Sequence, residues 1–595
     1  MQLTPIDWAI IVAYFALCLG IGLLLRKRAS SNYLEYFASG RSMTWWIAGT
    51  SMVATTFAAD TPLAVTGLIA KNGLAGNWFW WAFALGGMFT VFVFSRMWRR
   101  SEVLTDVELI ELRYSGRPAA FLRGFRGIYI AVVMNSIVIG WVTKAMADVL
   151  RNTVLTDLPQ GSHVDFLLVA GMLALTGVYS VLSGMWGVAI TDVIQFVLAM
   201  AGCIALAVLA VAHVGGIEAL QQKVAANFAG GEQVFHFLPD FSAQDPWMPV
   251  GVFLVMVFAQ WWATWYPGNE PGGGGYIVQR MASCKDEKHA IKATLLFQLA
   301  HYCVRPWPWI LVAFAAMAMY PDLLQKPDPG VGYPMVIRDL APAGLRGLLL
   351  VTFFAAFMST ISTQMNWGAS YLVNDVWRRF VKPQANDREL VAASRIASGL
   401  VLLLGGIAAG LMIVNGMSVD DAWKFLAALG AGVGLVFILR WFWWRINAWS
   451  EIAAMVGSLG FFAAFQGLDM HDSYRGLLVA LCCLALWLVV TMVTKPEGDA
   501  VLTSFYRKVR PDGPGWGPIA QRAPEVQRDG VLGRGILCAL LGTAVIWLTL
   551  PGIGAVIFGA HARAAMLLGG AAVALALLFR TMQPLLAAGP VSPRK

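Results

Sequence analysis

Long apolar stretches, each near the ~20 residues that a membrane-spanning helix needs, recur along the whole chain and constrain its fold most strongly. Examples are 8–25, 185–213, 396–416 and 475–494. The 595-residue chain is 58% hydrophobic and only 13% charged, with a mean hydropathy of +0.65. These values are far outside the range of soluble proteins. We therefore predict an all-α polytopic membrane protein with about 15 transmembrane helices.

The net charge of +9 does not indicate nucleic-acid binding, because the basic residues cluster after alternate predicted spans. By the positive-inside rule, this pattern places the start of the first span outside and its end in the cytoplasm. No short signal sequence precedes residues 6–26, so we interpret them as a retained span. We expect a multi-pass protein of a plasma membrane, the inner membrane of a bacterium. The clusters include Arg26, Lys27, Arg28, Arg96, Arg99, Arg100, Lys285, Lys288, Lys292, Arg378, Arg379 and Lys382.

The sequence has no motif typical of an enzyme or of an ATP-driven transporter. Its seven cysteines, including Cys482 and Cys483 within an apolar stretch, have the spacing of neither a disulfide framework nor a zinc site. The seven histidines form no HExxH-like pair, and no Walker motif or dinucleotide-type glycine loop is present. We predict neither a cofactor nor enzymatic activity.

Two predicted spans have breaks in their middles. In 44–70, Asp60 and Thr61 precede Pro62, a combination that is typical of a helix start. The predicted seventh span begins at Val252 and ends in the proline- and glycine-rich stretch 267–275. Paired interrupted spans are typical of the binding site of a secondary transporter. Backbone that is not helical is tolerated within the membrane only where it lines a cavity or is buried in protein.

Four sequence blocks resemble the signature blocks of the sodium:solute symporter family, in the family's order. They are "YLEYFASGRSMTWWIAGTSMVAT" (33–55), "YSVLSGMWGVAITDVIQ" (179–195), "YIVQRMASCKDEKHA" (276–290) and "GLRGLLLVTFFAAFMSTISTQMNWGASYLVNDV" (344–376). The resemblance implies a transmembrane core over 1–495. Its expected fold is the inverted five-plus-five helix repeat typified by LeuT, formed by spans two to six and seven to eleven. The expected activity is sodium-driven uptake of a small organic solute by alternating access.

The apolar stretch 353–367 contains four hydroxyls, which are costly in hydrocarbon unless they are bonded. Its residues 356, 359 and 360 share one helix face because their spacing is i, i+3 and i+4. We interpret Ser362 and Thr363 as lying off that face and bonding back to their own helix or packing. The resemblance implies a sodium site of three backbone carbonyls and two hydroxyls, from Ala54, Phe57, Ala356, Ser359 and Thr360.

Two predicted spans contain ionisable residues, which cost free energy in a membrane and are therefore candidates for a function. Members of the family keep an acid near the sodium site where this chain has Asp192, so we expect Asp192 to attract sodium. The alternative is that it orders a helix end near the cytoplasmic face. Arg305 is not a general feature of the family and would hold a substrate carboxylate or pair with Asp60. The alternative is a structural or snorkelling arginine beside the Pro306/Pro308 kink.

Further substrate candidates lie at the breaks. Asp60 is either an N-cap or a contact for a cationic or amino group. Thr61 occupies a position where family members contact their solute. The stretch 267–275 departs from the family's pattern, so the aromatic residue that gates the solute in the family cannot be assigned by position. We take Gln260 and Trp262 as the substrate candidates in this region. Tryptophans near the breaks either contact solute or form an interfacial belt: Trp78, Trp80, Trp81, Trp261, Trp262 and Trp265.

The most consistent function is sodium-coupled symport of an amino acid or another small carboxylate, with a sugar as the alternative. A passive channel could use the same hydroxyls but would not concentrate its solute. A sensor would need a signalling domain, which we do not find after residue 495. Residues 496–530 are polar and predict a cytoplasmic linker, and 531–595 predict two additional transmembrane helices. The sequence does not determine the oligomeric state.

Overall fold

The computed structural model consists of helices joined by short connections. Within the described residues it forms no strand, and eleven helices there are long and apolar enough to cross a bilayer. The prediction of an all-α, multi-pass membrane protein is confirmed. The predicted number of about 15 spans is not confirmed, because several predicted spans are divided into short helices. The structure describes residues 2–29, 31–157, 162–242, 246–264, 271–417, 422–423, 425–427 and 430–587.

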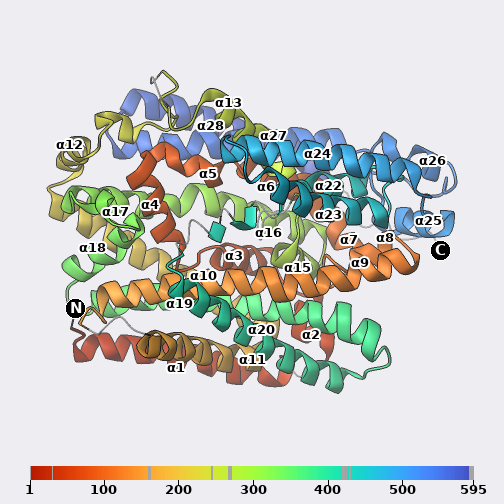
Figure 1. Cartoon of the computed structure of the whole chain (residues 1–595), viewed down its shortest axis with the longest axis horizontal. Helices are drawn as coiled ribbons and strands as arrows, with labels where there is room; N and C mark the ends of the chain where they lie inside the picture. The colour runs from red at the N-terminus through yellow and green to blue at the C-terminus, as the bar shows by residue number, and fades with distance from the viewer. Residues whose placement is uncertain are drawn as a thin grey trace.

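The long helices begin and end at the signals that the sequence carries. In α1 (Pro5–Ala29), Asp7 lies in the first turn and three basic residues lie in the last, so both ends complement the helix dipole. A capping box between Asn386 and Glu389 starts α20 (Asp387–Val414). Figure 1 shows α1 on the opposite side of the molecule from the C-terminal helices. The other long helices are α10 (Asn135–Thr153), α11 (Ser162–Val214), α19 (Leu345–Ser370), α23 (Ala448–Phe465), α24 (Asp472–Val493), α27 (Leu532–Ile557) and α28 (His561–Ala587).

Both predicted breaks interrupt helices. The first separates α3 (Trp45–Thr55) from α4 (Thr61–Asn72). The second follows α13 (Val250–Phe258) and α14 (Gln260–Ala263) and precedes α15 (Gly275–Ser283). Trp265 and residues 267–270 of the predicted insertion lie outside the described residues.

The described part of the glycine-rich stretch packs closely against Trp98. Gly272 and Gly273 adopt φ angles of 77° and 87°, a region that disfavours residues with a Cβ atom. The Trp98 indole N–H donates to the Gly272 carbonyl at 2.6 Å. A Cβ atom on Gly273 would lie 3.1 Å from the same indole nitrogen. Glycine therefore allows this backbone to approach α7 (Ser95–Ser101).

Four described segments are π-helical: η3 (Thr90–Phe94), η4 (Tyr129–Met134), η6 (Ala300–Val304) and η9 (Tyr371–Val381). Single π turns inside helices are rare and often occur at functional sites. The η6 segment joins α16 (Glu287–Leu299) to α17 (Pro306–Met319) within one predicted span. Arg305 is the residue between η6 and α17.

The centre of the molecule is α19, which packs against α10, α11, α20 and the end of α3. Nearly every side chain from Leu349 to Ser370 is buried. Polar side chains on a membrane helix that is buried on all sides bond either to their own helix or to neighbouring helices. Those hydroxyls of α19 that bond to neighbouring helices join elements that are far apart in the sequence.

The predicted linker over 496–530 is helical and attached to the core. It contains α25 (Asp499–Val509) and α26 (Gly517–Ala520). Trp516 is fully buried and donates its indole N–H to the Trp441 carbonyl at 2.7 Å. The Asp529 carboxylate lies 2.6 Å from Arg100 and 3.2 Å from Arg96 on α7. After this segment, α27 packs against α6 (Ala84–Phe89) and η3.

We expect Asp529→Asn to destabilise the folded protein by about 1.5–3 kcal/mol, because it removes the negative charge that pairs with two arginines. Both guanidinium groups are largely buried, so water compensates little. Thermal unfolding of the detergent-purified protein measures the effect. The matched control is Asp472→Asn, because the Asp472 side chain is 77% exposed and exposed ion pairs contribute little. Equal melting temperatures of the two variants would show that the attachment contributes no stability.

Candidate functional site

The five residues of the predicted sodium site lie at or beside the contact between the end of α3 and α19. The Thr360 hydroxyl oxygen lies 2.9 Å from the Thr55 carbonyl and 3.1 Å from the Ala356 carbonyl. Ala54 and Phe57 flank the first of these carbonyls in the chain. All five predicted residues are buried. The break in the second predicted span is thus joined directly to the helix that carries Ser359 and Thr360.

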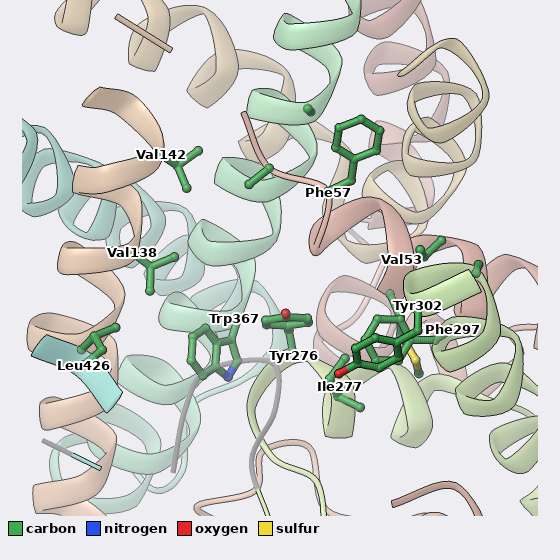
Figure 2. Packing of buried hydrophobic residues seen from close by; sticks show 14 of the residues in the cluster. Val53, Phe57, Val138, Val142, Tyr276, Ile277, Phe297, Tyr302, Trp367 and Leu426 are labelled. Atoms are coloured by element: carbon green, nitrogen blue, oxygen red, sulfur yellow. The ribbon is translucent and has the colours of Figure 1, made fainter. Parts of the chain in front are cut away.

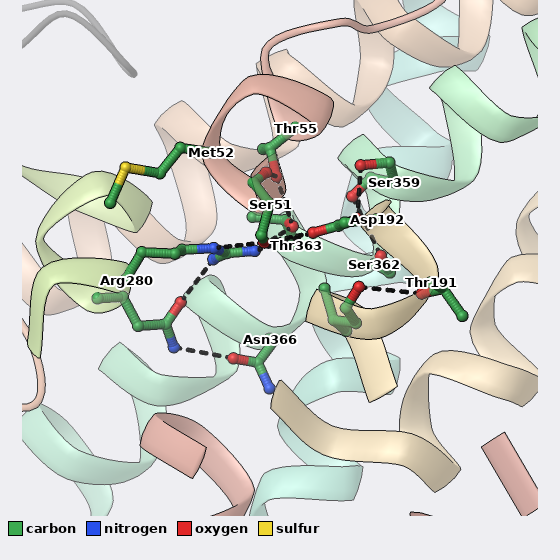
Figure 3. Close-up of polar contacts among 12 residues, drawn as sticks. Ser51, Met52, Thr55, Thr191, Asp192, Arg280, Ser359, Ser362, Thr363 and Asn366 are labelled. Atoms are coloured by element: carbon green, nitrogen blue, oxygen red, sulfur yellow. Dashed lines mark hydrogen bonds and ion pairs between the residues drawn. The ribbon is translucent and has the colours of Figure 1, made fainter. Parts of the chain in front are cut away.

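Asp192 accepts hydrogen bonds from two serines on different helices (Figure 3). The Ser359 hydroxyl donates to one carboxylate oxygen at 2.7 Å, and the Ser51 hydroxyl donates to the other. Asp192 lies well inside α11, beyond the kink at Gly184. Asp192 is therefore not a capping residue of α11.

Arg280, from α15, is the positive partner of Asp192. One of its terminal nitrogens lies 3.7 Å from the Asp192 carboxylate and donates to the Thr363 hydroxyl at 2.6 Å. Its Nε donates to Ser51 at 3.2 Å, and its other terminal nitrogen donates to the Gln279 side chain at 3.1 Å. Arg280 and Asp192 are both completely buried. Each charge is therefore stabilised mainly by the other and by the surrounding hydroxyl and amide groups.

This arrangement leaves one hydroxyl oxygen suited to bind a cation. A serine hydroxyl has one proton and two acceptor positions. Because Ser359 directs its proton at Asp192, the lone pairs of its oxygen stay available for another partner. The nearby carboxylate adds a negative charge without needing to be a ligand. Hydroxyl and carbonyl oxygens of this kind are preferred by hard cations.

Two hydroxyls of α19 outside the predicted sodium face differ in their roles. Ser362 donates to the Ser359 carbonyl at 3.1 Å, as the predicted bond back to its own helix requires. Thr363 follows the helix-packing alternative, because it accepts from Arg280 on α15 at 2.6 Å and lies 3.0 Å from the Thr55 hydroxyl on α3. Thr363 follows Ser359 by four residues, so it continues the same helix stripe.

A cavity of about 100 Å³ lies beside this polar cluster. Thr55 and Thr360 line it, so the predicted ion site and the cavity share residues. Val138, Val142 and Tyr276 form part of its apolar wall and come from α10 and α15 (Figure 2). Further aromatic lining residues are Phe79, Trp80, Phe83, Trp141 and Trp423. Apolar walls with a few polar groups are typical of small-molecule sites.

Arg305 lines the cavity and is held by neutral groups. Its side chain donates to the Val53 carbonyl at 3.1 Å and to the Thr56 hydroxyl at 2.9 Å. A second terminal nitrogen lies 2.6 Å from His301 Nδ1. Among the described residues no direct ion pair joins Arg305 to Asp60, although their charges interact across the cavity. Arg305 is also almost fully buried, which excludes the snorkelling alternative.

The remaining substrate candidates lie at different places. Asp60, Thr61 and Gln260 line the cavity. Asp60 occupies the N-cap position of α4, but its side chain makes no capping bond and instead accepts from the Trp423 indole at 3.0 Å. Trp262 is not among the described lining residues and donates to the Phe258 carbonyl at 2.8 Å.

Sequence reasoning did not select Arg280, His301 or Gln364. Arg280 lies in a quoted family block, but three lysines follow it closely and made the segment resemble a membrane boundary. A charged residue among Ile277, Val278 and Met281 is nevertheless a signal for a buried role. His301 precedes Arg305 by four residues, a helical spacing that places both on one face.

Known proteins resemble this chain at the level of the family and of the fold. The profile of the sodium:solute symporter family matches residues 36–460. A sodium/mannose cotransporter of Bos taurus is 28% identical over 480 residues, which cover 75% of this chain and 76% of the relative. The sodium/myo-inositol cotransporter 2 of Oryctolagus cuniculus is 27% identical over 486 residues, covering 75% and 67%.

Solved structures of other proteins share this fold, and we describe one of them. It is the substrate-bound, outward-open state of a Na⁺-coupled sialic acid symporter, with a TM-score of 0.66 and 21% identity. The match covers 84% of this chain and 99% of that structure. The expected symporter-like helical core is confirmed at the level of the fold.

Proposed function

The chain belongs to the sodium:solute symporter family, and from that premise we propose that it couples sodium entry to the uptake of a small organic solute. Members of this family are secondary active transporters rather than enzymes. Sodium is the coupling ion, and no cofactor is implied. The proposal includes alternating access across a plasma membrane, with the start of α1 outside.

The observation that carries this proposal is the direct hydrogen bond between Thr360 on α19 and the Thr55 carbonyl at the end of α3. Sodium would bind the carbonyls of Ala54, Phe57 and Ala356 and the hydroxyls of Ser359 and Thr360. Thr360 also lines the cavity. Ion and solute would therefore bias the same contact between α3 and α19, which gives their binding a physical route to coupling.

A small carboxylate, such as an amino acid, is the preferred solute class because Arg305 places a buried cation in the cavity wall. A guanidinium group presents its donors in a fork that matches a carboxylate. A sugar is the second candidate. It is favoured by the aromatic wall and by two of the relatives, which are cotransporters of mannose and of myo-inositol.

Uptake by the purified protein in liposomes tests the proposal. We expect a solute to accumulate above its external concentration when an inward sodium gradient is imposed, and not when choline replaces sodium. The gradient supplies the free energy, so dissipating it with a sodium ionophore should release the accumulated solute. A passive channel would only equilibrate the solute. Equal uptake in sodium and in choline would contradict sodium coupling.

A further inference from the structure

Two buried oxygen atoms in the cavity wall have no hydrogen-bond donor among the described residues. They are Asp60 Oδ1 and Gln364 Oε1, and both side chains are only 2% exposed. Buried polar atoms in folded proteins are nearly always paired. Asp60 lies at the start of α4 and Gln364 on α19, so the two atoms belong to separate elements. A bound solute that satisfies both must present hydrogen-bond donors at more than one point.

The cavity also contains a cation without a carboxylate partner among the described residues. Arg305 is 1% exposed, and its Nε atom has no hydrogen-bond partner. Its terminal nitrogens contact a carbonyl, a hydroxyl and an imidazole, all of them uncharged acceptors. Arg280, by contrast, has Asp192. The Asp60 carboxylate lines the same cavity but forms no direct ion pair with Arg305 among the described residues. A buried charge is strongly disfavoured unless it is closely paired, so an anionic group on the solute is the natural direct partner of Arg305.

The aromatic wall favours a ring or a compact chain over a flexible apolar solute. Trp80 stacks on Tyr302 with ring centroids 5.7 Å apart, which fixes the plane that Trp80 presents. Trp423 is fixed through its hydrogen bond to Asp60. Rigid aromatic faces provide a large contact area and leave the few polar groups to determine orientation.

We propose that the solute is a small polyhydroxylated carboxylate, such as a uronic or aldonic acid. Its carboxylate would face Arg305, and its hydroxyls would donate to Asp60 and Gln364. This assignment rests on the proposed symport function and names the solute class of the same site. An α-amino acid has a carboxylate, but its ammonium group presents all its donors at one point. A neutral sugar has the hydroxyls but leaves Arg305 without a counterion.

The test compares four radiolabelled solutes in liposomes that contain the purified full-length protein and an inward sodium gradient. The solutes are D-glucuronate, D-gluconate, D-glucose and L-alanine. We expect sodium-dependent uptake of at least one of the two acids, at least tenfold faster than uptake of glucose or alanine. D-Glucose is the matched control for D-glucuronate, because the two rings differ by oxidation of one carbon.

The outcomes separate this inference from the proposed function. Sodium-dependent uptake of only glucose or only alanine would overturn the inference and leave sodium symport standing. Failure to take up any of the four would also overturn it. A sodium-dependent rise in melting temperature of the same preparation, absent with choline, reports the ion site independently. Loss of that response would count against the proposed function itself.

Substitutions test the assigned contacts. Arg305→Lys keeps the charge but loses the fork, and it should weaken the affinity for the accepted acid at least tenfold without changing the sodium concentration for half-maximal uptake. Gln364→Leu removes one acceptor and should also weaken the affinity for the accepted acid. With two variants, the assignment can still be tested if one of them fails to fold. Arg507→Lys is the control, because Arg507 pairs with Glu525 and both side chains are 56% exposed. Unchanged affinity in both cavity variants would overturn the assignment.

Discussion

Asp192→Asn and Arg280→Gln are each expected to destabilise the folded protein by about 3–5 kcal/mol, because each change leaves a buried charge without its partner. Both residues are completely buried, and the hydroxyls around them cannot replace a full charge. The double variant Asp192→Asn/Arg280→Gln contains no unpaired charge. We expect it to recover at least half of the lost stability.

Thermal unfolding in detergent measures this cycle, with Asp339→Asn as the control. Asp339 pairs with Arg338 at 2.6 Å, but both side chains are about one-third exposed, so its loss should cost less than about 1 kcal/mol. If the double variant is as unstable as the sum of the single variants, the two charges do not stabilise each other.

The same variants separate stability from ion binding. If the Asp192 charge attracts sodium, the double variant should fold yet need more sodium for half-maximal uptake. Titrations at two ionic strengths adjusted with choline should agree, because buried charges are poorly screened. Wild-type sodium dependence in the double variant would make Asp192 structural only.

Ser359→Ala and Thr360→Ala are each expected to raise the sodium concentration for half-maximal uptake by roughly tenfold, equivalent to ~1.4 kcal/mol. Each removes one hydroxyl ligand from the proposed site. Ser359→Ala also removes the donor to Asp192, so its effect should be the larger. Sodium titration of solute uptake measures both variants after their expression has been matched.

Ser362→Ala is the matched control, because it removes a buried hydroxyl from the same helix. Among the described residues this hydroxyl donates only to the Ser359 carbonyl. We expect its sodium dependence to stay within about twofold of wild type, equivalent to ~0.4 kcal/mol. Equal shifts in all three variants would indicate a general distortion of α19 rather than a sodium site.

Local signals were sufficient to predict the framework of the site. The Asp60-Thr61-Pro62 sequence predicted a helix start, and α4 begins at Thr61. The i, i+3, i+4 spacing predicted that Ala356, Ser359 and Thr360 share a face, and the structure turns this part of α19 toward α3 and Asp192. These features depend on residues within one or two turns of each other.

The partners of the buried charges could not be predicted in the same way. Whether Arg305 faces Asp60 or neutral acceptors depends on how α17, α4 and α3 pack, which no local pattern specifies. The role of Thr363 was predictable in principle, because it continues the i+4 stripe from Ser359. Its partner Arg280 was not, since the pairing requires α15 to lie against α19 after the second break.

The π turn at η6 affects how relatives can be aligned with this chain. A π turn accommodates one residue more than the α-helix around it, and each residue turns a helix by about 100°. A relative with a regular α-helix here would have a one-residue gap in the alignment. If that gap is placed after position 305, Arg305 is matched to a residue on a different side of the helix. Equivalent cavity positions should therefore be assigned by superposition on both flanks of η6.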